Sequence, residues 1–197
     1  MILYLDTETS GLYPGNICQL SYIVQTDSEV RAKNFFFKVD FVEYGAYMIH
    51  GFSVEKLNVL SGGKRFIDHI KEIENDLLDA SLVVAHNTAF DLMFLRKEFE
   101  NCGKILQIGD TFCSMKAMTP VCKLPRRTGA GYKYPKLNEL CAFLGISDKD
   151  INFACKQFYG SFVDYHDARF DTVALCLACN RIMYGNYLDK IDLKNYL

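Results

Sequence analysis

The sequence predicts an α/β fold with a mixed central sheet, formed by a single domain that spans residues 1–197. Three observations support this prediction. Strand-like runs dominate the N-terminal part, strand and helix patterns alternate after it, and 197 residues suffice for one full hydrophobic core. Half of the residues are hydrophobic and 23% are charged, which is typical of a globular protein.

The N-terminal part is predicted to be a meander of strands. The apolar run Ile2–Leu5 predicts the first strand. Residues 18–24 alternate apolar and largely polar side chains, which predicts a half-buried strand. A turn is expected at Asp27-Ser28, and Val30–Val39 is its predicted hairpin partner.

Helices and strands alternate in the rest of the chain. Helical patterns are found over Ser53–Leu57, about Arg65–Leu78, Asn87–Phe99, Leu137–Leu144 and about Asp167–Tyr184. Strands are predicted over Leu82–Ala85 and Ile105–Ile108, with Asp110-Thr111 capping the next helical turn and Asn87 or Thr88 capping the helix at 87. Residues 186–197 are predicted to be a closing helix or a short amphipathic docking piece.

Two carboxylates stand one residue apart after the first apolar run, in Asp6-Thr7-Glu8. In a strand, residues two apart share a face, so both carboxylates point to the same place. Two buried negative charges need a positive partner between them, and a divalent cation is the simplest such partner for carboxylate oxygens. The pair therefore predicts a metal site.

Two further acids begin apolar stripes on predicted helices. Asp91 stands one turn before Leu95, and Asp171 leads a stripe that continues with Leu175, Ala178 and Ile182. An acid at the head of an apolar stripe faces the body of the protein. Four acids around one point match a site for two divalent ions, which lie roughly 3.5–4 Å apart in phosphoryl-transfer enzymes.

A general base is expected among the four histidines. His166 precedes Asp171 by five residues, which places it on the loop that enters the last helix, where its ordinary pKa of about 6.5 suits proton transfer at neutral pH. His50 is a weak candidate for substrate contact. His86 is expected to be a hydrogen-bonded core histidine, and Asp167 a helix cap.

Composition and charge indicate how the protein would bind nucleic acid and in which cellular compartment it is expected. A net charge of −2 means that nucleic acid would be bound by a local patch or through ions. No apolar run reaches membrane-spanning length, and no signal peptide is recognised, so the eight cysteines are expected to be reduced thiols in the cytoplasm. Cys176 and Cys179 form a lone C-x-x-C without a second pair, which argues against zinc.

Three motifs in order resemble those of the DEDDh 3′→5′ exonucleases, the DnaQ-like group that includes polymerase proofreading subunits, RNase T and oligoribonuclease. They are Asp6-Thr7-Glu8-Thr9, His86-Asn87-Thr88-Ala89-Phe90-Asp91 and His166-x-x-x-x-Asp171. Ile49-His50-Gly51 and Asp110-Thr111 resemble secondary signatures of that family. The similarity extends over nearly the whole chain.

The resemblance implies an RNase H-like fold with a five-stranded mixed sheet flanked by helices. It implies that two Mg²⁺ or Mn²⁺ ions are bound by Asp6, Glu8, Asp91 and Asp171, and that His166 activates the attacking water. It also implies substrate contacts with a free 3′ end by Thr7, by the backbone at Thr9, by Leu12 as a wedge against the last base, by His50, and by Asn87 and Phe90.

The predicted activity is release of nucleoside 5′-monophosphates from single-stranded 3′ ends, on DNA in a proofreading or repair role. The alternatives are an exoribonuclease of the RNase T or oligoribonuclease type, a proofreading module docked on a DNA polymerase, and a non-catalytic nucleic-acid binder, against which the intact acid set argues. The basic segment Lys123–Lys136, with Arg126, Arg127, Tyr132 and Tyr134, is predicted to grip the strand or to be a solvated loop.

Overall fold

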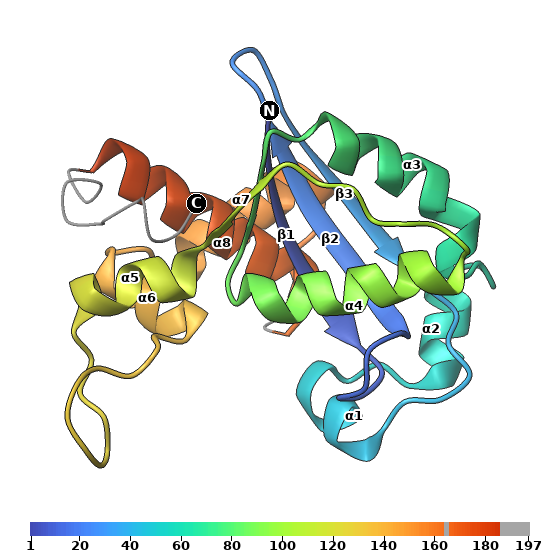
Figure 1. The fold of residues 1–197 in the computed structure, drawn as a ribbon, viewed down its shortest axis with the longest axis horizontal. Helices are drawn as coiled ribbons and strands as arrows, with labels where there is room; N and C mark the ends of the chain where they lie inside the picture. Colours follow the sequence, from blue (N-terminus) through green and yellow to red (C-terminus); the bar gives the residue numbers. More distant parts are fainter. Residues whose placement is uncertain (164–165, 186–197) are drawn as a thin grey trace.

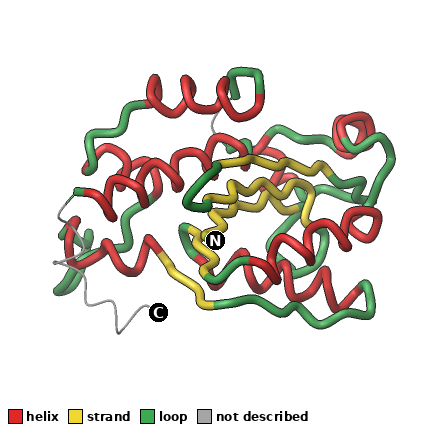
Figure 2. Tube along the Cα trace, turned by 90° about the horizontal axis from the view of Figure 1, so that it is seen from above, coloured by secondary structure: helices red, strands yellow, loops and turns green. Residues whose placement is uncertain are grey.

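The computed structural model describes residues 1–163 and 166–185. Five strands form one mixed sheet in the order β3-β2-β1-β4-β5, with helices on both sides (Figures 1 and 2). The strands are β1 (Ile2–Thr9), β2 (Ile17–Gln25), β3 (Val30–Phe36), β4 (Leu82–Ala85) and β5 (Asp110–Cys113). The helices of the described part are α1 (Tyr44–His50), α2 (Val54–Leu60), α3 (Phe66–Asp79), α4 (Thr88–Asn101), α5 (Ser114–Cys122), α6 (Leu137–Phe143), α7 (Asp148–Tyr159) and α8 (Ala168–Tyr184).

The central strand β1 divides the core into two layers. Leu3 and Leu5 point to the side covered by α3 and α4, where they pack in one buried cluster. Tyr4 points to the other side, where it packs with residues of α5, α6, α7 and α8. This alternation follows from the two-residue period of a strand. It also decides which helix each polar residue at the end of β1 will meet.

The topology brings two strand ends to one edge of the sheet. β1 pairs antiparallel with β2 and parallel with β4, with Ile2 opposite Leu82 and Tyr4 opposite Val84. Because β1 and β4 run in the same direction, the residues that follow β4 lie beside the carboxyl end of β1. The start of α4 therefore comes close to the acids of β1.

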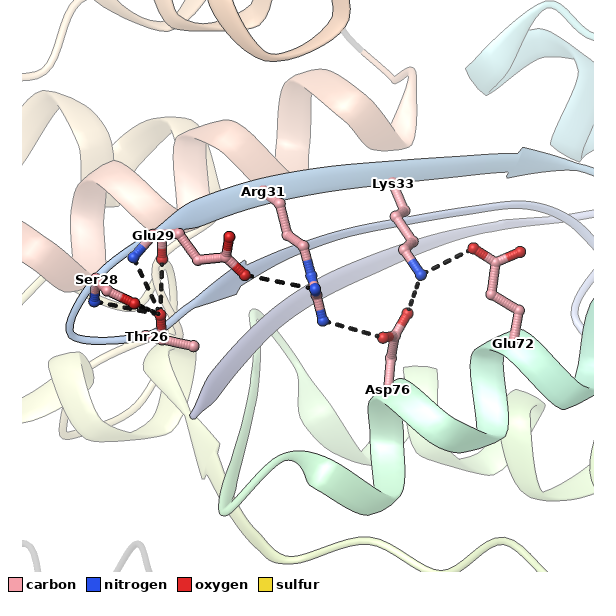
Figure 3. Close-up of polar contacts among 7 residues, drawn as sticks. All are labelled: Thr26, Ser28, Glu29, Arg31, Lys33, Glu72 and Asp76. Carbon is pink, nitrogen blue, oxygen red and sulfur yellow. Dashed lines mark hydrogen bonds and ion pairs between the residues drawn. The ribbon is translucent and has the colours of Figure 1, made fainter.

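A network of charged side chains attaches the edge strand β3 to α3 (Figure 3). Lys33 of β3 contacts Asp76 at 2.6 Å and Glu72 at 2.8 Å. The Tyr22 hydroxyl of β2 donates to the same buried Asp76 carboxylate at 2.6 Å, and Arg31 contacts it at 3.4 Å. Asp76 is buried but has three partners, so its charge is compensated.

Several sequence predictions about the elements are wrong. No strand forms over Ile105–Ile108, and Asp110-Thr111 begins β5 instead of capping a helix. Gly109 helps to explain why β5 starts at Asp110, because the chain passes close to another segment at this glycine: a Cβ there would lie 2.6 Å from the carbonyl oxygens of Ala80 and Ser81. A larger residue at this position would clash with the backbone that follows α3. The pairing of β5 starts directly after Gly109, with the Asp110 N–H donating to the Ser81 carbonyl at 3.1 Å.

The burial of β2 also differs from the prediction. Residues 17–24 are buried on both faces, because helices cover both sides of the sheet. The helices α1 and α7 were not predicted, and α5 is a full helix from Ser114 to Cys122 where only a helical turn after Asp110-Thr111 was expected. The predicted side-chain cap of α4 is absent: Asn87 occupies the N-cap position without a side-chain cap bond, and the Thr88 hydroxyl donates to the carbonyls of Ala85 and Phe112. The prediction for residues 186–197 lies outside the described residues.

No helix in the part of the chain that the structure describes has both the length and the apolar character needed to cross a membrane. All eight cysteines are free thiols, and Cys176 and Cys179 are core residues of α8 itself.

Candidate active site

Asp6 and Glu8 of β1 point to the same face as Tyr4, toward α8. Asp171 stands in the first turn of α8. One carboxylate oxygen from each of Asp6, Glu8 and Asp171 lies within 4.8 Å of the other two. The strand period and the packing of α8 on the sheet therefore bring three acids from distant parts of the chain to one point.

These three carboxylates are difficult to ionise together. Burial is the largest cause that raises the pKa of Asp6, and the carboxylates of Asp171 and Asp91 add to it. The pKa of Glu8 is raised for the same kinds of reason. Burial, followed by the nearby Asp167 carboxylate, raises the pKa of Asp171 to about 7. Like charges at this spacing ionise together when a cation lies among them.

Asp91 approaches the cluster from the opposite face of the sheet. It stands in the first turn of α4, is 4% exposed, and accepts a hydrogen bond of 2.9 Å from the Thr7 hydroxyl. Burial raises its pKa to about 7, and the bond from Thr7 opposes that rise. Among the described residues, the oxygens that meet within 4.8 Å do not include Asp91, but its charge raises the pKa of both Asp6 and Glu8.

Thr7 was predicted to contact substrate, and the structure gives its side chain a different position. It lies between the two acids on β1 and therefore points to the α4 face. Its side chain is buried and its hydroxyl is bonded to Asp91. Thr7 thus links β1 to the first turn of α4.

His166 lies two residues before α8, as predicted, with an exposed side chain and a positive φ of 60°. The next residue, Asp167, is the N-cap of α8, which confirms its predicted role. Its carboxylate accepts a bond of 3.1 Å from the Arg169 N–H and bonds of 2.8 and 2.7 Å from the Arg169 guanidinium. The chain that carries His166 is therefore fixed on its C-terminal side.

Gln19 attaches this helix start to the sheet. It is fully buried on β2, directly opposite Glu8 in the strand register. Its Nε2 donates to Asp167 at 2.8 Å, and its Oε1 accepts from the Ala168 N–H at 3.1 Å. A single amide thus fixes the beginning of α8, and with it Asp171, relative to the acids of β1. This role of Gln19 was not predicted, because its place in the alternating pattern of β2 indicated a solvent-facing side chain.

His50 supports the end of β1. The Phe52 N–H donates to Nδ1 at 3.0 Å, so Nδ1 is unprotonated and the Nε2–H donates to the Thr9 carbonyl at 3.2 Å. Burial is the main cause that lowers the pKa of His50, which is therefore a neutral imidazole. Both ring nitrogens are thus occupied by the protein, close to the backbone that was predicted to meet the 3′-hydroxyl.

Leu12 lies in the loop of residues 10–16 between β1 and β2 and is 78% exposed. Glu98 of α4 fixes the end of this loop, because its buried carboxylate accepts bonds of 2.7 Å from the N–H groups of Asn16 and Ile17. At the start of the loop, the Glu43 N–H donates to the Ser10 carbonyl at 2.7 Å. Glu98 was missed by the sequence analysis.

Asn87 and Phe90 lie at the beginning of α4. Asn87 adopts a left-handed conformation with φ of 97°, which asparagine tolerates better than most residues. Phe90 is half-buried and packs against Phe94 with 4.8 Å between ring centroids. Both residues follow β4, whose carboxyl end lies beside that of β1, so they lie on the same edge of the sheet as the acids.

His86 is hydrogen-bonded on both ring nitrogens, as expected of a core histidine, although the residue is only partly buried. Its Nε2 bonds to the Pro135 carbonyl and its Nδ1 to the Ser114 hydroxyl, each at 2.9 Å. Burial lowers its pKa to about 4. Through this contact, His86 ties the end of the basic segment to the end of β4.

The basic segment forms a hairpin. Pro125 and Tyr132 form a β-bridge across it, and the Arg126 Nε donates to the Tyr132 carbonyl at 2.9 Å. Arg126 and Arg127 are exposed. In Figure 1 this hairpin projects beyond α6 and lies well apart from the carboxyl end of β1. The structure does not bring the two arginines together with the acid cluster.

The donor set fits hard divalent cations. Carboxylate oxygens are the ligands that Mg²⁺ and Mn²⁺ prefer, and the described residues place no lysine or arginine among the three clustered oxygens. The raised pKa values of Asp6, Glu8 and Asp171 are the expected property of a site that a cation completes.

Comparisons with known proteins agree with this geometry. The family model RNase_T, described as Exonuclease, matches residues 3–176. A search of curated proteins finds no match. Among solved structures, the chain is similar to one described as the crystallographic structure of the nuclease domain of 3′hExo, a DEDDh family member, bound to rAMP. The TM-score is 0.67 and the identity 12%, and the similarity covers 94% of this chain and 92% of that one.

Proposed function

The chain belongs to the DEDDh exonuclease family and is a 3′–5′ exonuclease, and we propose that it removes nucleoside 5′-monophosphates one at a time from single-stranded DNA ends in a proofreading or repair role. The observation that carries this proposal is the meeting of Asp6, Glu8 and Asp171 within 4.8 Å beside the buried Asp91. We also propose that residues 1–197 act as one exonuclease domain.

The family uses divalent metal ions, and we propose that Asp6, Glu8, Asp91 and Asp171 hold two of them, Mg²⁺ or Mn²⁺. Such ions, when bound, would neutralise the carboxylates and stabilise the charge that develops on the phosphate. The spacing of the three clustered oxygens and their raised pKa values support this assignment.

The chain's own residues would carry the rest of the reaction. His166, exposed on the loop before α8, would accept the proton of the attacking water. The new bond joins the water oxygen to phosphorus, and the bond to the 3′-oxygen of the preceding nucleotide breaks. Thr9 and Leu12 would receive the terminal nucleotide, with His50 holding the Thr9 carbonyl in place at 3.2 Å.

A ribonucleotide end is the second candidate substrate. The structural neighbour was crystallised with rAMP, which supports an exoribonuclease of the RNase T or oligoribonuclease type. A DNA polymerase is a further proposed partner for a proofreading module. The eight free thiols support a cytoplasmic location.

The test uses purified protein with Mg²⁺ or Mn²⁺ and 5′-labelled single- and double-stranded DNA and RNA. We expect a ladder that shortens from the 3′ end, with 5′-mononucleotides as products and the greatest rate on single-stranded DNA. Greater activity on RNA would select the second candidate, and release from the 5′ end would contradict both.

Variants assign the roles of individual residues. Asp6→Ala and Asp171→Ala should abolish the metal-dependent reaction while the protein remains folded. His166→Ala should lower kcat by about 10²–10⁴ with a smaller effect on the Mg²⁺ concentration needed for half-maximal activity. Digestion at the normal rate by the His166→Ala variant would remove His166 from the mechanism.

A further inference from the structure

A cavity of about 630 Å³ opens beside the acid cluster, on the side of α6, α7 and α8. Asp6 and Asp171 are among the residues that line it, together with His86 and His166. Its volume lies within the range of about 300–1,000 Å³ that is typical of small-molecule sites. The cavity is therefore large enough for a nucleotide and directly adjoins the proposed reaction centre.

The position of the cavity distinguishes it from the site proposed for the terminal nucleotide. Leu12, His50 and Phe90, which were assigned to that nucleotide, do not line it. Among the described residues, its lining includes Asp6 of β1 and none of the loop of residues 10–16. If the terminal nucleotide lies next to Leu12, the nucleotide on the other side of the scissile phosphate needs a separate space beside the acid cluster. This cavity provides such a space.

The walls of the cavity suit a nucleobase. Apolar residues line part of it, among them the buried Cys141, Ile151 and Phe170 and the exposed Ala142. Polar side chains also line it: Lys136, Asn138, Ser147 and Asp148 contribute an ammonium, an amide, a hydroxyl and a carboxylate. A lining that combines apolar residues with a small number of polar groups is typical of a site for a small organic group such as a base.

Lys136 is the charged group best placed for a backbone phosphate. Its side chain is exposed, and among the described residues no carboxylate lies within ion-pair distance of its ammonium. Its position is fixed on both sides: the Pro135 carbonyl bonds to His86 at 2.9 Å, and the Lys136 N–H donates to Glu139 at 2.8 Å.

We infer that this cavity is the subsite for the nucleotide on the 5′ side of the scissile phosphate, with its base against the apolar wall and its own phosphate near Lys136. The inference rests on the proposed exonuclease function. It assigns recognition of the substrate strand to the segment from Lys136 to Ser147, and not to the distant Arg126 and Arg127 alone.

The test compares two substrates that share the terminal nucleotide. One is a single-stranded oligodeoxynucleotide, and the other is the p-nitrophenyl ester of thymidine 5′-monophosphate, whose leaving group carries neither a base nor a phosphate. Lys136→Glu should lower kcat/KM on the oligonucleotide by about tenfold, with little change on the ester. Ala142→Tyr, at an exposed position that lines the cavity, should act in the same way by filling it.

Lys149→Glu is the matched control, because Lys149 is exposed on α7 and does not line the cavity. It makes the same change in charge and should leave kcat/KM unchanged on both substrates. Equal losses on ester and oligonucleotide with Lys136→Glu, or unchanged cleavage of both, would overturn the subsite.

A binding measurement separates failure of the subsite from failure of the proposed function. Fluorescence anisotropy of a 5′-labelled oligonucleotide is recorded with Asp171→Asn protein, in which hydrolysis should be abolished. Adding Lys136→Glu should raise Kd about tenfold. It should also lower the slope of log Kd against log salt concentration by about one, which corresponds to about one released counterion fewer. An unchanged Kd would overturn the subsite, whether or not the wild-type protein digests the substrate. Failure of the wild-type protein to digest any substrate would instead overturn the proposed function.

Discussion

The Thr7 hydroxyl donates to Asp91 at 2.9 Å, and this bond connects the two faces of the sheet at the acid cluster. Asp6 and Glu8 point toward α8, whereas Thr7 between them points toward α4. One three-residue segment of β1 thus supplies two acids and positions a third.

Thr7→Val tests this connection, because valine keeps the shape and removes the donor. Without the bond, the pKa of Asp91 should rise further, since Thr7 is the largest influence that lowers it. We expect kcat to fall about 10–100-fold. Thr119→Val on α5, which removes a hydroxyl bonded to the Met115 carbonyl, is the control and should leave kcat unchanged. Equal kcat for the Thr7→Val and wild-type proteins would contradict the role of Thr7.

Gln19→Leu tests whether the buried amide positions the start of α8. The change leaves Asp167 and the Ala168 N–H without their partner on β2, so Asp171 and His166 should lose their fixed positions. We expect kcat to fall about 10–100-fold and the Mg²⁺ concentration for half-maximal activity to rise, with KM for the oligonucleotide little changed.

Gln25→Leu provides the matched control for this experiment. Gln25 stands on the same strand and exchanges bonds of 3.3 and 3.2 Å with Asn180, far along α8 from the acids. Both variants remove a glutamine bonded to α8. If both lower kcat equally, the effect of Gln19 is one of general stability and not of positioning.

We expect Glu98 to hold in place the loop of residues 10–16, which carries Leu12. Glu98→Ala leaves the N–H groups of Asn16 and Ile17 without their acceptor, at a cost of about 1–3 kcal/mol in the free energy of unfolding. KM for the oligonucleotide should rise. Glu98→Gln keeps an acceptor oxygen and should behave like wild type in both respects. If the alanine variant has a normal KM, the loop does not need this support to bind substrate.

The acid cluster predicts how stability depends on pH and on metal. Asp91 and Asp171 have pKa values of about 7 in the folded protein, against about 3.9 in an unfolded chain. Between these values the folded state binds more protons, so without metal these groups make the free energy of unfolding fall as pH rises. A bound cation removes this penalty, because it favours the ionised carboxylates.

Tm measured in EDTA and in Mg²⁺ checks this prediction. The stabilisation by Mg²⁺ should grow between about pH 5 and about pH 8. His86, with its pKa lowered to about 4, makes stability rise with pH below about 6.5, but equally in both buffers, so it cancels in the comparison. A stabilisation that is constant with pH, or that persists in Asp6→Ala protein, would contradict a metal site at this cluster.

The sequence predicted the elements whose signals are local. The two-residue period put Asp6 and Glu8 on one face, and the helical stripe below Asp171 turned that acid inward, as the structure shows. The helix α7 could also have been found, because Ser147 and Asp150 form a capping box at its start. The five-stranded fold followed from the family resemblance, not from periodicity.

The sequence by itself determined that Asp6 and Glu8 share a face and that Asp171 turns inward, because strand and helix periods fix the direction of each side chain from its neighbours along the chain. Only the tertiary structure decided how these residues are held. Gln19 meets Asp167 across 148 positions and Glu98 meets Ile17 across 81, and β5 starts at Asp110 because Gly109 passes close to the carbonyls of Ala80 and Ser81. Contacts of this kind depend on how whole elements pack, and packing is set by the entire core and not by any local pattern.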